Sequence, residues 1–286
     1  MSIVKSSDPF TFHHGSSPLL LSIPHDGRKL KVGMSSKMTK QALLLPDTDW
    51  YINNLYDFSH QLEASVISAD YSRYVVDLNR SSEDLSLYED QISTGLCPLK
   101  TFSNENIYSS MSQINSKEIN QRIEKYWSPY HEKIKTVLRQ KKKEFGYALL
   151  WDAHSIKTCV PDLFEGKLPY LNIGTNSGKS CPQKIEDAVY NVAKDSTYSS
   201  VLNQRFKGGF ITRHYGIPQN QFYAIQLEIA QSCYMNESSL TYDIALAKKL
   251  TITLKKMLET FMMTAEKYNK SPVSYTHLRA HETRIH

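Results

Sequence analysis

The chain has 286 residues, 40% of them hydrophobic, and its 34 Lys and Arg against 29 Asp and Glu give a formal net charge of +5. This length and composition can bury a substantial core, which indicates one large domain. The basic residues are scattered except at Lys141–Lys143, the four cysteines form no C-x-x-C pair, and no apolar run approaches the length of a membrane span, so nothing indicates a nucleic-acid-binding surface, a disulfide framework or a membrane protein.

The first expected strand ends in a His–Asp pair. In Leu19–Gly27 an apolar run leads directly into His25, Asp26 and a turn glycine. A short apolar run followed by polar residues is typical of a buried strand in an α/β sheet. Ligands of such sheets bind beyond the carboxyl ends of the strands, which is where His25 would lie.

A helix, two strands and a loop are expected next. Ser65–Ala69 and Tyr74–Leu78 have the composition of strands, and Ser81–Ser110 predicts a long loop or lid. Asp47 or Thr48 could cap the helix that precedes the strands, and its apolar face would consist of Trp50, Leu55, Phe58 and Leu62.

A long amphipathic helix is predicted over Asn115–Phe145, with a kink or break at Pro129 and an end at Gly146. The strand that follows, Tyr147–Ser155, is again apolar until it reaches polar residues, here Asp152 and His154. It is therefore the second strand whose end offers a histidine.

The last part of the chain adds two helices and a third polar strand. Ile185–Lys194 and Tyr242–Tyr268 have helical periodicity. Phe222–Ala230 is an alternating strand that carries Glu228 among apolar neighbours. An unpaired carboxylate is costly to bury, so Glu228 either faces solvent or has a chemical role.

Two histidines and an acid at the ends of separate strands could converge on one metal ion. Neutral imidazole and carboxylate, with one position left open for water, is the composition of a catalytic zinc site. The spacing contains no compact motif such as H-E-x-x-H, so the pattern alone leaves the ligands open.

Several longer blocks identify a family. They are Ser22–Gly27, Leu45–Tyr51, Tyr71–Arg80, Thr94–Pro98, Leu150–Ser155, Arg205–Gly216 and Gln226–Gln231. In these blocks the chain resembles the N-formylglutamate amidohydrolase (deformylase) family, metal hydrolases related in fold to the zinc carboxypeptidases.

The resemblance implies a fold and a reaction. The fold would be a single α/β domain over residues 1–270, with a mixed central sheet flanked by helices in a zinc-carboxypeptidase-like architecture. The reaction would be hydrolysis of N-formyl-L-glutamate to formate and L-glutamate, the closing step of one histidine-degradation route. The cofactor would be one Zn²⁺ ion and the substrate a small anionic N-acyl amino acid.

The resemblance also implies metal ligands. Zinc carboxypeptidases place a glutamate three residues after the first histidine, but Arg28 stands there in this chain. We therefore expect the third ligand to come from an aspartate, with Asp49 preferred over Asp47 and Asp26. Asp152 is expected to orient an imidazole. The expected ligand set is His25, Asp49 and His154.

A base and several cationic anchors complete the expected site. Glu228 is expected to be the general base, and a solvent-facing Glu228 is the alternative. Arginine binds carboxylates in a bidentate manner, so we expect a group of cationic and polar residues to contact the substrate. For each of these residues taken singly, a surface ion pair is the alternative role. This group consists of Arg73, Asn79, Arg80 and Arg213, with support from Lys207 beside Gly208.

Two other functions stay open at this stage. One is a metal amidohydrolase or carboxypeptidase-like enzyme for another N-acyl amino acid, and the other is a carboxylate-binding protein without activity. We expect a cytoplasmic protein, because Met1–Phe10 lacks the apolar core of a signal peptide; monomer and homo-oligomer both stay open. Residues 271–286 resemble translated sequencing-adapter sequence and are expected to be a non-native, disordered tail.

Overall fold

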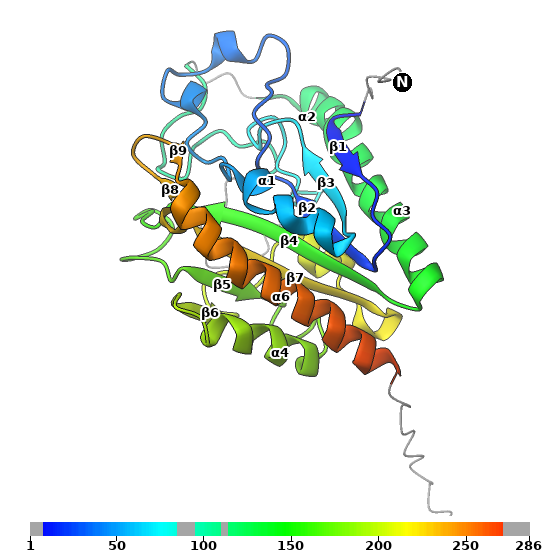
Figure 1. Ribbon diagram of the computed structural model, residues 1–286. Coiled ribbons are helices and arrows are strands. Elements are labelled where there is room, and N and C mark those ends of the chain that lie inside the picture. Colours follow the sequence, from blue (N-terminus) through cyan, green and yellow to red (C-terminus); the bar gives the residue numbers. More distant parts are fainter. Residues whose placement is uncertain (1–7, 85–94, 110–113, 271–286) are drawn as a thin grey trace, which may run out of the picture.

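The structure is a computed structural model that describes residues 8–84, 95–109 and 114–270. Its centre is a seven-stranded sheet with helices on both faces (Figure 1). The strands of this sheet are β1 (Phe10–His13), β2 (Leu19–Ile23), β3 (Ser65–Ala69), β4 (Ala148–Ile156), β5 (Leu171–Gly174), β6 (Ser200–Leu202) and β7 (Phe222–Ala230). A separate pair consists of β8 (Met235–Asn236) and β9 (Thr241–Tyr242).

The large sheet is mixed, as the resemblance implied. Its strand order is β1-β3-β2-β4-β7-β5-β6. The four strands β3, β2, β4 and β7 run parallel, while β1 is antiparallel to β3 and β5 is antiparallel to β7. The carboxyl ends of the parallel strands therefore meet at one edge of the sheet.

Helices cover the sheet on both sides. Their bounds are α1 (Ile52–Leu55), α2 (Ser116–Arg122), α3 (Ser128–Phe145), α4 (Gln183–Lys194), α5 (Phe210–Tyr215) and α6 (Ile244–Lys270). One core contains Leu149 and Trp151 of β4 together with α4 and α6. The other contains Ala148 and Leu150 together with α3 and α5. Because both faces of the central strands are buried, their sequences are continuous apolar runs.

The long helix predicted over Asn115–Phe145 is interrupted in the turn that precedes Pro129, in keeping with the predicted break. Asn115 caps α2, and a π turn, Ile123–Trp127, separates α2 from α3. Pro129 has no N–H to donate to the carbonyl of Lys125, four residues earlier, and this residue lies in the π turn. Gly146 ends α3 in the left-handed region, with φ of 84°, as predicted.

The strand predicted at Tyr74–Leu78 does not form. This segment is buried but irregular, and its apolar composition reflects burial rather than sheet pairing. The backbone N–H of Asp77 donates to Leu96, and the carbonyl oxygens of Tyr74 and Val75 accept from the Arg122 side chain. A helix side chain thus takes the place of a neighbouring strand.

The predicted cap of the helix after Pro46 is also wrong. Neither Asp47 nor Thr48 caps α1, which begins after Tyr51, a residue in the left-handed region with φ of 64°. The expected single helix is the short α1 followed by the 3₁₀ segment Asp57–Leu62.

The long loop expected over Ser81–Ser110 contains neither helix nor strand in its described parts, 81–84 and 95–109. Its role as a lid stays a prediction. The remaining residues of this loop lie outside the described residues, as does the predicted tail over 271–286.

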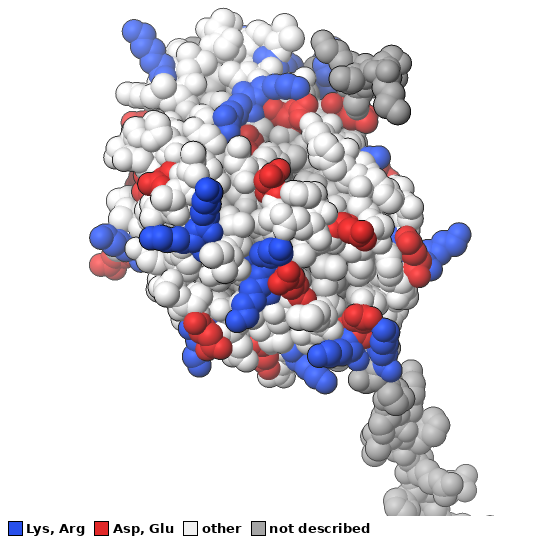
Figure 2. Space-filling view, in the orientation of Figure 1, with Lys and Arg blue, Asp and Glu red and all other residues white. Residues whose placement is uncertain are grey.

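Charges are interspersed on the surface. On the face shown in Figure 2, basic and acidic side chains alternate without a large patch of one sign. Among the helices that the structure describes, none combines the length and the apolar character that a membrane crossing requires.

The packing of α6 yields a stability prediction. Leu254 is fully buried against the sheet, whereas Ile252 on the same helix is 72% exposed. We expect Leu254→Ala to lower the free energy of unfolding by about 2–5 kcal/mol, because the cavity left by leucine collapses only in part. Ile252→Ala should change it by less than about 0.5 kcal/mol. Urea unfolding of both variants measures the difference, and equal losses would contradict this assignment of the core.

Candidate metal centre

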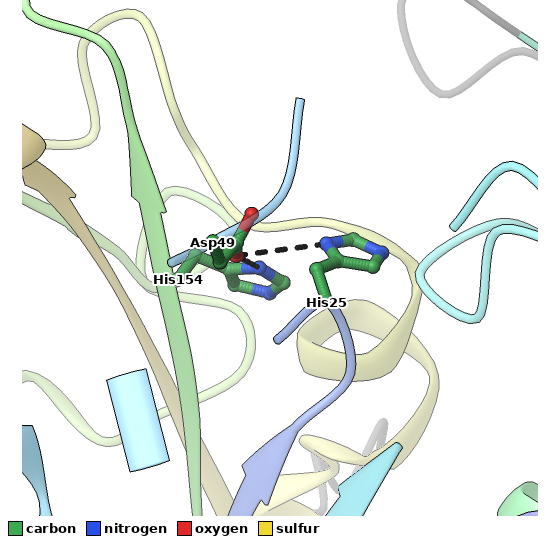
Figure 3. A group of neighbouring side chains, drawn as sticks. All are labelled: His25, Asp49 and His154. Atoms are coloured by element: carbon green, nitrogen blue, oxygen red, sulfur yellow. Dashed lines mark hydrogen bonds and ion pairs between the residues drawn. The ribbon is translucent and has the colours of Figure 1, made fainter. Parts of the chain in front are cut away.

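His25, Asp49 and His154 lie together at the carboxyl ends of β2 and β4 (Figure 3). One potential ligand atom from each lies within 4.8 Å of the others, and all three side chains are buried. The Asp49 carboxylate lies between the two imidazoles, with Oδ2 3.0 Å from Nδ1 of His154 and 3.7 Å from Nδ1 of His25. The structure therefore brings together the three residues expected as ligands.

The secondary structure explains this meeting. His154 belongs to β4, and His25 follows β2, which pairs in parallel with β4. Asp49 comes from the loop before α1, and its backbone N–H donates to the His25 carbonyl oxygen over 3.1 Å. The N–H of Ser155 donates to Asp49 Oδ2 over 3.2 Å. Backbone contacts thus join the loop to both histidine segments.

The imidazole of His25 presents a free nitrogen to the cluster. Its Nε2 lies 2.8 Å from the Asp77 carboxylate, which can only accept, so this nitrogen carries the hydrogen. Its Nδ1 is buried and has no hydrogen-bond partner among the described residues. This buried lone pair faces the Asp49 carboxylate and lacks a partner. A metal ion bound between the two groups would supply one.

A second carboxylate lies behind His154. Asp152 Oδ1 is 3.2 Å from His154 Nε2, as the sequence led us to expect. Burial opposes the charged imidazole, but Asp152 and Asp49 raise the pKa of His154 well above its ordinary value. Burial also favours a neutral Asp49, yet its hydrogen bond with His154 and the nearby imidazole of His25 hold the pKa of Asp49 below its ordinary range. The cluster therefore attracts positive charge, and its donor set fits a divalent cation.

The two rival aspartates make contacts elsewhere. Asp47 Oδ2 accepts from the Tyr74 hydroxyl over 2.8 Å and from the Phe102 N–H over 2.9 Å. Asp26 Oδ2 accepts from the Asn53 backbone N–H over 2.9 Å. Neither belongs to the cluster formed by Asp49.

Asp77 is a residue of the candidate site that the sequence analysis did not single out. It contacts His25, and its second oxygen accepts from Arg73 Nη2 over 2.6 Å. Burial favours the neutral acid, but the charge of Arg73 and the contact with His25 hold the pKa of Asp77 well below its usual range. An acid within the apolar Tyr74–Leu78 run was the signal that could have identified it.

Arg73 and Asn79, both expected to contact substrate, make close contacts within the protein. Arg73 also lies 3.8 Å from Asp49, and only 11% of its side chain is exposed. The Asn79 amide accepts from the Ile211 N–H over 2.8 Å, and its Nδ2 is 3.0 Å from His154 Nε2. Their substrate contacts stay predictions.

The other expected anchors lie on neighbouring segments. Arg80 and Arg213 are partly exposed and Lys207 is exposed. Gly209 packs so closely against Asn79 that an added Cβ would lie 2.3 Å from its Nδ2. This contact explains a glycine at position 209, while the substrate contacts of Lys207, Arg80 and Arg213 stay predictions.

Glu228 faces the interior. It lies opposite His154 in the β4–β7 register and is 8% exposed, so the alternative of a solvent-facing residue is wrong. Its carboxylate forms no hydrogen bond with any described residue. Burial raises the pKa of Glu228 to about 8 against the opposing effect of His154. A carboxyl group with such a pKa can exchange protons near neutral pH.

Comparisons with known proteins agree on one family. A family model described as N-formylglutamate amidohydrolase matches residues 17–235. An N-formylglutamate deformylase from Pseudomonas putida is 44% identical over 263 residues, 91% of this chain and 98% of the relative. One from Pseudomonas aeruginosa is 44% identical over 254 residues, 88% of this chain and 95% of the relative.

A solved structure agrees with the fold. The crystal structure of N-formylglutamate amidohydrolase from Ralstonia eutropha JMP134 has a TM-score of 0.77 and 19% identity, covering 91% of this chain and 98% of that one. At this identity the likeness shows that the two chains share an α/β fold.

The geometry yields a prediction about the third ligand. We expect Asp49→Asn to weaken divalent-metal binding strongly, because it removes the negative charge of a ligand. The loss should exceed the roughly 10- to 100-fold that follows mutation of a residue hydrogen-bonded to a ligand. Asp47→Asn, in the same loop, should retain the metal, since an amide oxygen can still accept from Tyr74 and Phe102. Metal content after dialysis, measured by mass spectrometry, checks both variants. Loss of metal in Asp47→Asn alone would reverse the assignment.

Proposed function

The chain belongs to the N-formylglutamate amidohydrolase family, and we propose that it hydrolyses N-formyl-L-glutamate to formate and L-glutamate at the cluster of His25, Asp49 and His154. The observation that carries the reaction is the 44% identity with two N-formylglutamate deformylases over almost their whole length. The cluster supports a hydrolytic site because it combines metal donors with a buried carboxyl group at the same edge of the sheet.

The cofactor that we propose is one Zn²⁺ ion. Two imidazoles and one carboxylate are a usual ligand set of catalytic zinc, which keeps a position open. When bound, such an ion polarises a carbonyl oxygen and lowers the pKa of water. Asp77 and Asp152 would hold the two imidazoles in place, since their carboxylates lie at the Nε2 atoms of His25 and His154.

We assign the role of general base to Glu228. Its carboxylate would accept a proton from the attacking water and return it to the nitrogen of the departing glutamate. The opposition of Glu228 and His154 on adjacent strands supports this role, because it puts the carboxylate next to the cluster. The raised pKa supports it as well, because a carboxyl group whose pKa lies near the working pH is a stronger base than an ordinary carboxylate and can still donate the proton afterwards.

The two carboxylates of the substrate require cationic partners. We propose that Arg80 and Arg213 supply them, since both are partly exposed. Arg80 follows Asn79, whose amide lies 3.0 Å from His154, and Arg213 belongs to α5, whose Ile211 N–H donates to the same amide. Arg73 pairs with Asp77 and Asp49, so its charge serves the cluster first. A role in histidine degradation, a cytoplasmic location and a relation in fold to the zinc carboxypeptidases stay predictions drawn from the resemblance.

The substrate proposal predicts a selective and metal-dependent reaction. We expect turnover of N-formyl-L-glutamate, loss of activity on dialysis against a chelator and its return with Zn²⁺. Formate release measures the reaction, and free glutamate measures any cleavage of N-acetyl-L-glutamate, the control compound. Faster cleavage of the acetyl compound would point to another N-acyl amino acid, and bound metal without turnover of either would exclude the proposed substrate.

The base proposal predicts a defect in the chemical step. We expect Glu228→Gln to lower kcat by about 10²- to 10⁴-fold, the usual contribution of a positioned base, while metal content stays at the wild-type level. Glu144→Gln, an exposed position on α3, serves as the matched control and should leave kcat unchanged. A Glu228→Gln enzyme with wild-type kcat would remove this residue from the chemistry.

A further inference from the structure

The segment Asp77–Arg80 supports the proposed site but belongs to no strand. It includes Asp77, which contacts His25, and Arg80, the proposed substrate anchor. Buried backbone carbonyl groups need hydrogen-bond donors, and a segment outside the sheet must obtain them from elsewhere. What holds this segment therefore controls where its side chains lie.

Three side chains from the region of α2 and α3 supply the donors. Each donates one N–H to a carbonyl oxygen of residues 75–80 over 2.9 Å. We call these three side chains the helix clamp. The pairs are Arg122 Nη1 with Val75, His131 Nε2 with Leu78, and Trp127 Nε1 with Arg80.

The side chains of the helix clamp are closely packed. Arg122 is 2% exposed and is held by Glu118, whose carboxylate lies 2.6 Å from its Nη2. The rings of Trp127 and His131 stack with centroids 3.9 Å apart, and Phe210 of α5 packs against both. Burial lowers the pKa of His131 to about 3, so this imidazole stays neutral and keeps the hydrogen on Nε2 that the carbonyl requires.

The π turn makes this arrangement possible. In an α-helix, residues four apart lie on the same face. Trp127 and His131 have this spacing and lie on one face without any irregularity. Arg122 and Trp127 are five residues apart, and they share a face only where the helix contains i→i+5 bonds. The turn Ile123–Trp127 lies between them.

We propose that the π turn Ile123–Trp127 is a positioning device for substrate binding. It aligns Arg122, Trp127 and His131 so that they fix the backbone of residues 75–80 and, through it, the Arg80 side chain. These clamp residues act through the segment and do not touch the substrate. The inference rests on the proposed function, because Arg80 is taken as an anchor for the substrate.

Removal of one indole N–H tests the helix clamp. Trp127→Phe keeps the ring stack but loses the hydrogen bond to Arg80, and we expect KM for N-formyl-L-glutamate to rise about 5- to 10-fold, the effect of one lost hydrogen bond, with kcat within twofold of wild type. Trp151→Phe is the matched control, because its indole donates to Tyr56 in the opposite core. It should lower thermal stability and leave KM unchanged.

Hydrogen exchange provides a readout that does not depend on the reaction. Exchange in the peptide covering residues 77–80 should be faster in Trp127→Phe and unchanged in Trp151→Phe. Unchanged exchange in Trp127→Phe would overturn the clamp, and faster exchange with unchanged KM would overturn its role in substrate binding. A wild-type protein inactive on N-formyl-L-glutamate would refute the proposed function, while exchange would still decide on the clamp.

Insertion of an alanine after Lys125, an exposed residue of the π turn, tests the turn itself. It puts Arg122 and Trp127 six residues apart, which turns Trp127 by about 120° away from Arg122 in a regular α-helix. We expect unchanged helix content by circular dichroism and a larger rise in KM than in Trp127→Phe. A wild-type KM would show that the π turn is not the device. If the insertion unfolds the chain, Trp127→Phe alone decides.

Discussion

Three aspartates, two histidines and an arginine are buried in contact at the carboxyl ends of β2 and β4, and their charges have to balance with little help from water. Removing one partner from a buried ion pair costs about 3–5 kcal/mol, because the other charge is left without compensation. Arg73 contributes the one fixed positive charge of this group, and it joins Asp77 to Asp49. Such a group of charges constrains every segment that contributes to it, because a small displacement would expose an uncompensated charge to an apolar surrounding.

The strands that carry the histidines and Glu228 could be predicted from the sequence, because a buried parallel strand is a continuous apolar run and its polar end stands out. The apolar neighbours of Glu228 drew attention to it, while its place beside the cluster comes from the pairing of β4 and β7, which sets it opposite His154. Parallel strands bring their carboxyl ends to one edge of a sheet, so residues distant in sequence become neighbours there.

Other features could not be read from local patterns. Tyr74–Leu78 has the composition of a strand, but its carbonyl groups are satisfied by helix side chains, an arrangement that depends on tertiary contacts. Pro129 marked the region of the break, but the π turn before it has no composition of its own. The choice among Asp26, Asp47 and Asp49 depended on which loop lies over His25, and the family blocks contain all three.

The origin of the cluster in separate parts of the chain has a consequence for folding. His25, Asp49 and His154 come from two strand ends and a loop, and they meet only after β2 and β4 have paired. The unfolded chain therefore offers no comparable site, and a cation that occupies it adds its binding free energy to the stability of the native state, about 2.7 kcal/mol at a concentration 100 times its Kd. The availability of the metal would then govern how long the folded chain survives as well as how fast it works.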